Sequence, residues 1–201
     1  PGPRPTHYRV HGEQAALFYD GDAGSALMAQ VQVLTDHSLE SATMEADHTF
    51  ASAHHGVAEP RGEIVLATHR TAASGLPEKV DILHQHGDHY HGEGTISLDC
   101  PDLHGAGSNE EYSVFGCSDG ILIVHQDGET FTAQHVDNAT LGLAAGERVG
   151  SFDSQHELPQ FVAYAGDRIL IIHPDHGDAE ELDWTEGAAV SLDSHALDSH
   201  G

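Results

Sequence analysis

The chain has 201 residues, of which 33 are acidic, 7 are basic and 19 are histidine, and its formal net charge at pH 7 is −26 with histidine neutral. This charge excludes a nucleic-acid backbone or an anionic lipid surface as the natural partner and favours cations or a basic protein. Apolar residues make up 38% of the chain and the acidic residues are scattered, so we expect a folded core rather than a disordered acidic tail.

The start of the chain, Pro1 to Pro5, contains neither a Met nor the apolar centre of a signal peptide. No apolar run approaches the roughly 20 residues that a helix needs to cross a bilayer. We therefore expect no membrane insertion, and we interpret the start as a processed or truncated end from which an export signal has been removed.

A repeated pattern runs along the chain. In each copy a turn leads into an apolar strand, and the copies are residues 13–20, 62–69, 119–125 and 166–173. Their starts are about 50 residues apart, which is the period of four-stranded propeller blades. Continuous apolar runs such as 121–124 are typical of strands that are covered on both faces.

The flanking segments complete each repeat. Residues 112–117 and 130–135 lie on either side of the third copy and are separated from it by Gly-containing turns, which predicts an antiparallel meander. No segment shows a helical period. We therefore predict an all-β protein, a β-propeller of four-stranded antiparallel blades formed by residues 1–201, with about four blades present and repeats at roughly 8–50, 51–99, 100–150 and 151–195.

A closed propeller of four blades is small, and the segment Ser191 to His195 resembles the opening of a further unit. We therefore favour a chain that is part of a larger propeller over a complete four-bladed one.

The densest histidine segment contains two His-x-His pairs separated by Gly-Asp; the four residues are His84, His86, His89 and His91. Alternation with period two places both histidines of a pair on one face of a strand, and Gly-Asp is a strong hairpin turn. The folded hairpin would offer a near-complete tetrahedral set of imidazoles for zinc, copper or nickel. The alternative is an exposed histidine-rich loop that binds metal only opportunistically.

A second histidine pattern lies just before the Tyr- or Phe-rich inner strand of successive repeats; its members are His55, His104 and His156, with Asp193-Ser194-His195 as a fourth candidate. In a propeller these positions would ring one mouth of the central channel and could share an ion. The alternative is that these histidines cap turns or bond strand carbonyls. We leave out the strand-end histidines, which are readily solvated; they are His125, His173 and His176.

Acidic residues next to these histidines are candidate ligands or acceptors that orient an imidazole ring; they are Asp88, Asp99, Asp102 and Asp153. The two cysteines, Cys100 and Cys117, flank a short loop whose closure by a disulfide would stabilise the fold by roughly 3 kcal/mol and would favour an oxidising compartment. Two buried free thiols are the alternative.

Taken together, the histidine hairpin, the His-Gly pairs at His55 and His104, the two cysteines and the 50-residue β repeat resemble the periplasmic zinc metallochaperones of the AztD type. The resemblance implies a periplasmic β-propeller that binds zinc and passes it to the solute-binding protein of a zinc ABC transporter. The chain has about half of the length expected for that family and lacks its extended histidine-rich N-terminal segment.

We therefore expect a zinc carrier and not an enzyme. The alternative is a metal-dependent propeller hydrolase of the lactonase or esterase type, in which an aspartate serves as general base. No Gly-x-Ser-x-Gly or His-Glu-x-x-His motif supports it. A third class, a structural interaction propeller, would bind no divalent metal. The choice of zinc over copper depends on the resemblance, because imidazole alone does not distinguish them.

Overall fold

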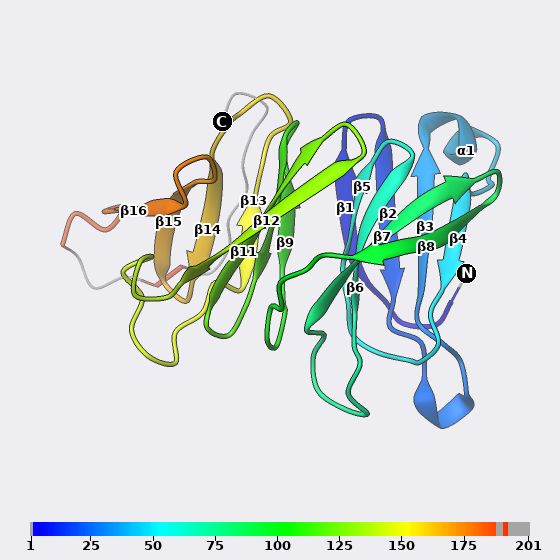
Figure 1. Cartoon of the computed structure of the whole chain (residues 1–201), viewed down its shortest axis with the longest axis horizontal. Coiled ribbons are helices and arrows are strands. Elements are labelled where there is room, and N and C mark those ends of the chain that lie inside the picture. Colours follow the sequence, from blue (N-terminus) through cyan, green and yellow to red (C-terminus); the bar gives the residue numbers. More distant parts are fainter. Residues whose placement is uncertain (1, 188–190, 193–201) are drawn as a thin grey trace. The chain divides into compact units, whose positions relative to one another are not determined.

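The computed structural model describes residues 2–187 and 191–192. Almost all of the regular structure in these residues is β-strand, which confirms the all-β prediction (Figure 1). The chain divides into two compact units, unit 1 (Pro1–Leu103) and unit 2 (His104–Gly201). None of the described helices has the length and apolar character that crossing a membrane requires.

Unit 1 consists of two antiparallel meanders of four strands. The first contains β1 (Pro5–His11), β2 (Gln14–Tyr19), β3 (Gln30–Thr35) and β4 (Ala46–Thr49), and the second contains β5 (Ala58–Arg61), β6 (Ile64–His69), β7 (Lys79–His86) and β8 (His89–Thr95). A parallel pairing of β4 with β8 joins them into one sheet in the order β1-β2-β3-β4-β8-β7-β6-β5. Because β1 and β5 also contact each other, the sheet is nearly closed.

The interior of this sheet is filled by alternate apolar side chains of its strands. Phe18 of β2, Val31 of β3, Val65 of β6, Leu83 of β7 and Tyr90 of β8 are all buried in one cluster. The period of two sends the intervening residues of each strand to the outer face. Burial of each large apolar side chain contributes about 1.5–3 kcal/mol, so the register of the strands is strongly fixed.

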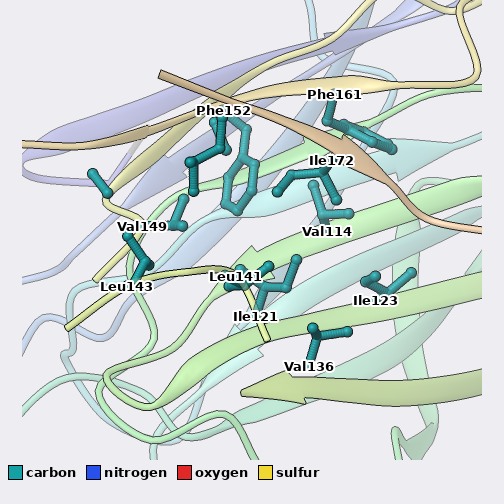
Figure 2. Close-up of a cluster of buried hydrophobic side chains, with 13 residues drawn as sticks. Val114, Ile121, Ile123, Val136, Leu141, Leu143, Val149, Phe152, Phe161 and Ile172 are labelled. Atoms are coloured by element: carbon teal, nitrogen blue, oxygen red, sulfur yellow. The ribbon is translucent and has the colours of Figure 1, made fainter. Parts of the chain in front are cut away.

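Unit 2 contains two separate four-stranded antiparallel sheets. The first is formed by β9 (Ala106–Ser108), β10 (Tyr112–Gly116), β11 (Gly120–Asp127) and β12 (Thr130–Asp137), and the second by β13 (Ser151–Asp153), β14 (Phe161–Ala165), β15 (Arg168–His173) and β16 (Asp178–Leu182). Both sheets contribute to one apolar core, in which Val114 and Ile121 of the first sheet lie near Phe152, Phe161 and Ile172 of the second (Figure 2).

The four repeated segments of the sequence are all strands, namely β2, β6, β11 and β15. They are not equivalent in position, because β2 and β6 are second in their meanders whereas β11 and β15 are third. The four-bladed propeller is therefore not confirmed. In unit 1 the short β4 leaves an edge that pairs with β8, and this pairing merges two expected blades into one sheet.

The sequence also missed two short helical turns, the 3-10 turn η1 (Ala23–Ser25) and the helix α1 (Asp36–Glu40). Five residues are too few to show a helical period. Instead α1 is defined by a capping box, in which Thr35 and Ser38 exchange hydrogen bonds between their side chains and backbone amides at 2.9 and 3.2 Å. The candidate segment Asp193-Ser194-His195 lies outside the described residues.

The two cysteines behave as predicted. Both Cys100 and Cys117 are disulfide-bonded and fully buried. Since the chain contains only these two cysteines, the bond joins them to each other. The alternative of two free thiols is therefore wrong.

Candidate metal centre

The histidine segment forms the predicted hairpin. Strands β7 and β8 are connected by the two residues Gly87 and Asp88 (Figure 1). Gly87 has a φ of +69°, a left-handed conformation that glycine adopts without the penalty that a Cβ atom brings. The Gly-Asp dipeptide therefore fixes the turn and, with it, the register of the two strands.

The register brings the four histidines together on one face of the hairpin. His84 lies opposite His91, and His86 lies opposite His89. Leu83, which precedes His84, and Tyr90, which lies between His89 and His91, belong to the apolar core, so the imidazoles occupy the outer face. Their ring centroids are 5.4 Å apart for His84 and His86, 5.1 Å for His86 and His91, and 4.6 Å for His89 and His91.

The nitrogen atoms of this face are spaced for a small cation. His89 Nε2 and His91 Nε2 are 2.8 Å apart, and tetrahedral zinc with Zn–N bonds of 2.0–2.1 Å holds its nitrogens about 3.3 Å apart. His84, His86 and Glu93 have ligand atoms that all lie within 4.8 Å of one another. Small side-chain rotations would bring either set into a coordination sphere.

One ring nitrogen of this histidine face lacks a hydrogen-bond partner in the described part of the chain. His84 Nδ1 is buried and has no hydrogen-bond partner among the described residues. A buried ring nitrogen without a partner is costly, and a metal ion would satisfy it. The donor set of imidazoles with one carboxylate also suits zinc.

Carboxylates support the hairpin at both ends. His89 Nδ1 donates to Asp88 Oδ1 at 3.1 Å, and this hydrogen bond holds the pKa of Asp88 below its ordinary value. His86 Nε2 lies 3.8 Å from Glu93 Oε1. Glu93 was not among the predicted acids, although it continues the alternation of His89 and His91; a bulge in the β7–β8 ladder lies beside it.

A second histidine pair lies elsewhere in unit 1. His7 Nε2 of β1 is 3.1 Å from His55 Nε2 of the segment before β5, and the two rings meet edge to face at 4.9 Å. His55 Nδ1 donates to Asp20 Oδ2 at 2.9 Å, and Asp20 Oδ1 accepts from Thr6 Oγ1 at 2.6 Å. A carboxylate that orients an imidazole in this way is typical of zinc ligands.

The sequence identified only one member of this second pair. His55 was a candidate, but His7 and Asp20 were not. His7 is 48 residues away from its partner, and the two approach because β1 and β5 meet where the eight-stranded sheet closes. No local spacing signals such a contact.

The remaining histidine candidates belong to unit 2. His104 precedes β9, and its Nδ1 donates to the Gly150 carbonyl at 3.1 Å, so its Nε2 is unprotonated in the neutral ring. His156 is exposed and follows β13 instead of preceding the first strand of its meander, so its expected equivalence to His55 and His104 is wrong in position. The ring of histidines around one channel mouth remains a prediction.

The other acidic candidates make different contacts. Asp99 pairs with Lys79. Asp153 accepts a hydrogen bond from the Tyr164 hydroxyl at 2.9 Å, and burial, together with this hydrogen bond, raises the pKa of Tyr164. Asp102 is exposed in the segment that follows β8 in unit 1 and has a φ of +50°.

One further cluster contains Cys117, Asp119 and His135 of unit 2. His135 Nε2 lies 2.9 Å from Asp119 Oδ1. Because Cys117 is disulfide-bonded, it offers no thiolate, and this cluster is a weaker metal site than the two in unit 1.

Comparison with known proteins places the fold. No protein-family model matches the chain, and no curated protein matches it by sequence. Among solved structures, apo AztD from Citrobacter koseri matches with a TM-score of 0.69 and 19% identity over 90% of this chain and 47% of that chain. A second crystal structure of Citrobacter koseri AztD matches with a TM-score of 0.69 and 18% identity, over 90% and 46% of the two chains. In fold, the chain is therefore similar to about half the length of AztD.

Proposed function

We propose that this chain is a zinc carrier of the periplasm, which binds zinc through its clustered histidines and delivers it to the solute-binding protein of a zinc ABC transporter. The single observation that carries the proposal is the set of four imidazoles on one outer face of the β7–β8 hairpin. The structural similarity to AztD supports the same role, since the AztD-type proteins are the metallochaperones that the sequence resembles.

The exposure of the face suits a carrier. Three of its four histidines are exposed and His84 is partly buried. A partner protein can therefore approach the ion and exchange its own ligands for those of the carrier before the ion is free in solution. The net charge of −26 also raises the local concentration of cations near the surface.

The disulfide supports the compartment. A buried Cys100–Cys117 bond persists in an oxidising environment such as the bacterial periplasm and is rare in the reducing cytosol. The proposed periplasmic location rests on this bond together with the resemblance.

We propose a binding role and no catalytic role for these residues. Zinc is the proposed cargo because its preferred donors are imidazole and carboxylate, which both clusters of unit 1 supply. Copper(II) also binds such donors tightly in vitro. The identity of the cargo is therefore tested by which metal the chain delivers to the solute-binding protein, and not by affinity alone.

The first experiment measures zinc affinity and stoichiometry by competition with a chromogenic chelator. The intact chain is compared with the variants His89→Ala/His91→Ala and His7→Ala/His55→Ala, and with the control His173→Ala/His176→Ala in unit 2. We expect the first two variants to lose one tight site each and the control to keep both. Zinc binding that is weak and equal in all four proteins would contradict the proposal.

A second experiment tests delivery. Zinc-loaded protein is mixed with the apo solute-binding protein while a chelator in excess traps any free ion. Zinc found on the solute-binding protein at a rate above that of spontaneous release would support direct transfer. Zinc found only on the chelator would contradict delivery while leaving zinc binding intact, and metal-dependent turnover of a lactone or ester panel would favour a hydrolase instead.

A further inference from the structure

Unit 1 contains a cavity that the metal clusters do not use. It has a volume of about 550 Å³ and is lined by the end of β4, the following segment to His54, the end of β6 with Arg70, and Asp81 of β7. A cavity of this size can hold a small organic molecule. Its apolar lining residues include Phe50, Ala72 and Ala73.

Arg70 is the cation of this cavity, and the chain holds it in a fixed position. Its Nη2 donates to the Ala53 carbonyl at 2.9 Å and its Nη1 donates to the Gly75 carbonyl at 3.2 Å. Both acceptors are neutral. Its Nε is buried and has no hydrogen-bond partner among residues 2–187 and 191–192.

The absence of an acid beside Arg70 is unusual for this composition. The chain has 33 acidic residues for 7 basic ones, and four of the other six cations form ion pairs with carboxylates in the described part of the chain, namely Arg4, Arg9, Lys79 and Arg168. No described carboxylate lies within ion-pairing distance of Arg70. A guanidinium that is held in place by backbone carbonyls and has no carboxylate beside it is prepared for an anion.

The other polar groups of the cavity are already oriented. His69 Nδ1 lies 3.0 Å from Asp81 Oδ2, and Asp81 Oδ1 accepts from Thr95 Oγ1 at 2.9 Å, so both oxygens of this carboxylate are occupied. His48 Nδ1 donates to the Tyr90 carbonyl at 2.9 Å. Arg70 is therefore the group in this lining that lacks its natural counter-charge.

We propose that this cavity binds a small carboxylate with an apolar body. The carboxylate accepts hydrogen bonds from the terminal N–H groups of Arg70 that are not used for the Gly75 and Ala53 carbonyls, one on Nη1 and one on Nη2, in a planar two-point contact. The apolar body lies against Phe50 and the two alanines. This site is separate from the zinc clusters, and its test does not depend on whether the chain transports zinc.

The test is calorimetric titration of the intact chain with benzoate as the probe and with benzamide as its uncharged analogue of the same shape. The protein is first freed of metal with phenanthroline, because a carboxylate chelator would compete for the cavity. The first variant is Arg70→Gln, which removes the positive charge and the paired N–H donors of the guanidinium. The second is Arg4→Gln, which removes the same charge from a residue outside the cavity. Circular dichroism checks the fold of each variant.

We expect saturable benzoate binding that is at least about tenfold weaker for benzamide and for Arg70→Gln, and unchanged for Arg4→Gln. If Arg70→Gln does not fold, Ala72→Leu decides, since it narrows the cavity at its lining and leaves the guanidinium in place; it should also weaken benzoate binding. Benzoate binding that survives in the folded variant, or no saturable binding of benzoate in the intact chain, would overturn the proposal. Tighter binding of inorganic phosphate than of benzoate would overturn the carboxylate class.

Discussion

Replacement of Asp20 by asparagine should weaken zinc binding at the His7–His55 pair by about 10- to 100-fold, or about 1.4–2.7 kcal/mol, which is the usual effect of losing a carboxylate that orients a histidine ligand. The structure supports a value in this range. Asp20 receives the His55 Nδ1–H at 2.9 Å, and its side chain is only 19% exposed, so water screens the interaction weakly.

The hairpin supplies an internal comparison. Asp88 makes a similar contact with His89 Nδ1 at 3.1 Å, but its side chain is 98% exposed. Exposed pairs contribute little because water competes for both partners. The matched change Asp88→Asn should therefore weaken zinc binding at the hairpin by less than about threefold.

Each variant is measured in a chain that retains one cluster. Asp20→Asn is tested in the His89→Ala/His91→Ala background, and Asp88→Asn in the His7→Ala/His55→Ala background. Chelator competition at pH 7.5 gives the affinity, and circular dichroism confirms the fold. If Asp20→Asn binds zinc within twofold of its parent, or if Asp88→Asn has the larger effect, the assignment of Asp20 as the orienting carboxylate is refuted.

Three further predictions concern stability. Gly116→Ala should lower the free energy of unfolding by about 1–3 kcal/mol, because its Cβ atom would lie 2.2 Å from the Val149 carbonyl oxygen. The matched control in a urea titration is Gly94→Ala, another strand glycine without a positive φ, whose Cβ atom would meet nothing within 4 Å. Reduction of the disulfide should cost about 3 kcal/mol in the same assay, and no change on adding reductant would contradict the loop-closure argument. Arg168→Gln should destabilise unit 2 at pH 7. The Arg168 hydrogen bond holds the pKa of Glu181 below its ordinary 4.5. The stabilisation from this pair is therefore fully present above pH 4.5 and is lost as the pH falls through the lowered pKa of Glu181. The melting temperatures of the parent chain and of Arg168→Gln should differ at pH 7 and should approach each other at pH 3.5.

The sequence predicted best what is local. The period of two in the histidines and the Gly87-Asp88 turn together determine the hairpin, its register and the shared face of His84 and His91, because strand alternation and turn chemistry act within a few residues. The predicted disulfide is confirmed for the simpler reason that only two cysteines exist.

What the sequence missed depends on contacts between distant strands. The pairing of His7 with His55 arises from the approach of β1 to β5, and the merging of two expected blades arises from the single pairing of β4 with β8. Neither has a signature in spacing or composition. Likewise Arg70 is one arginine among several in the sequence, and its missing partner is visible only when the surrounding carbonyls are in place.

The junction between β4 and β8 is the narrowest connection in the eight-stranded sheet. Its ladder pairs only Asp47 with His89, next to one long backbone hydrogen bond of 3.3 Å from the Asp47 amide to the Asp88 carbonyl, and the His48 side chain adds its hydrogen bond to the Tyr90 carbonyl. The same His89 supplies an imidazole of the hairpin face. Zinc bound there would restrain the strand that closes the junction, so loss of the ion and local opening of the sheet are thermodynamically linked. In the empty protein the amide protons of β4 should exchange with solvent faster than in the loaded one, and a partner that pulls these strands apart would thereby promote release of the cargo.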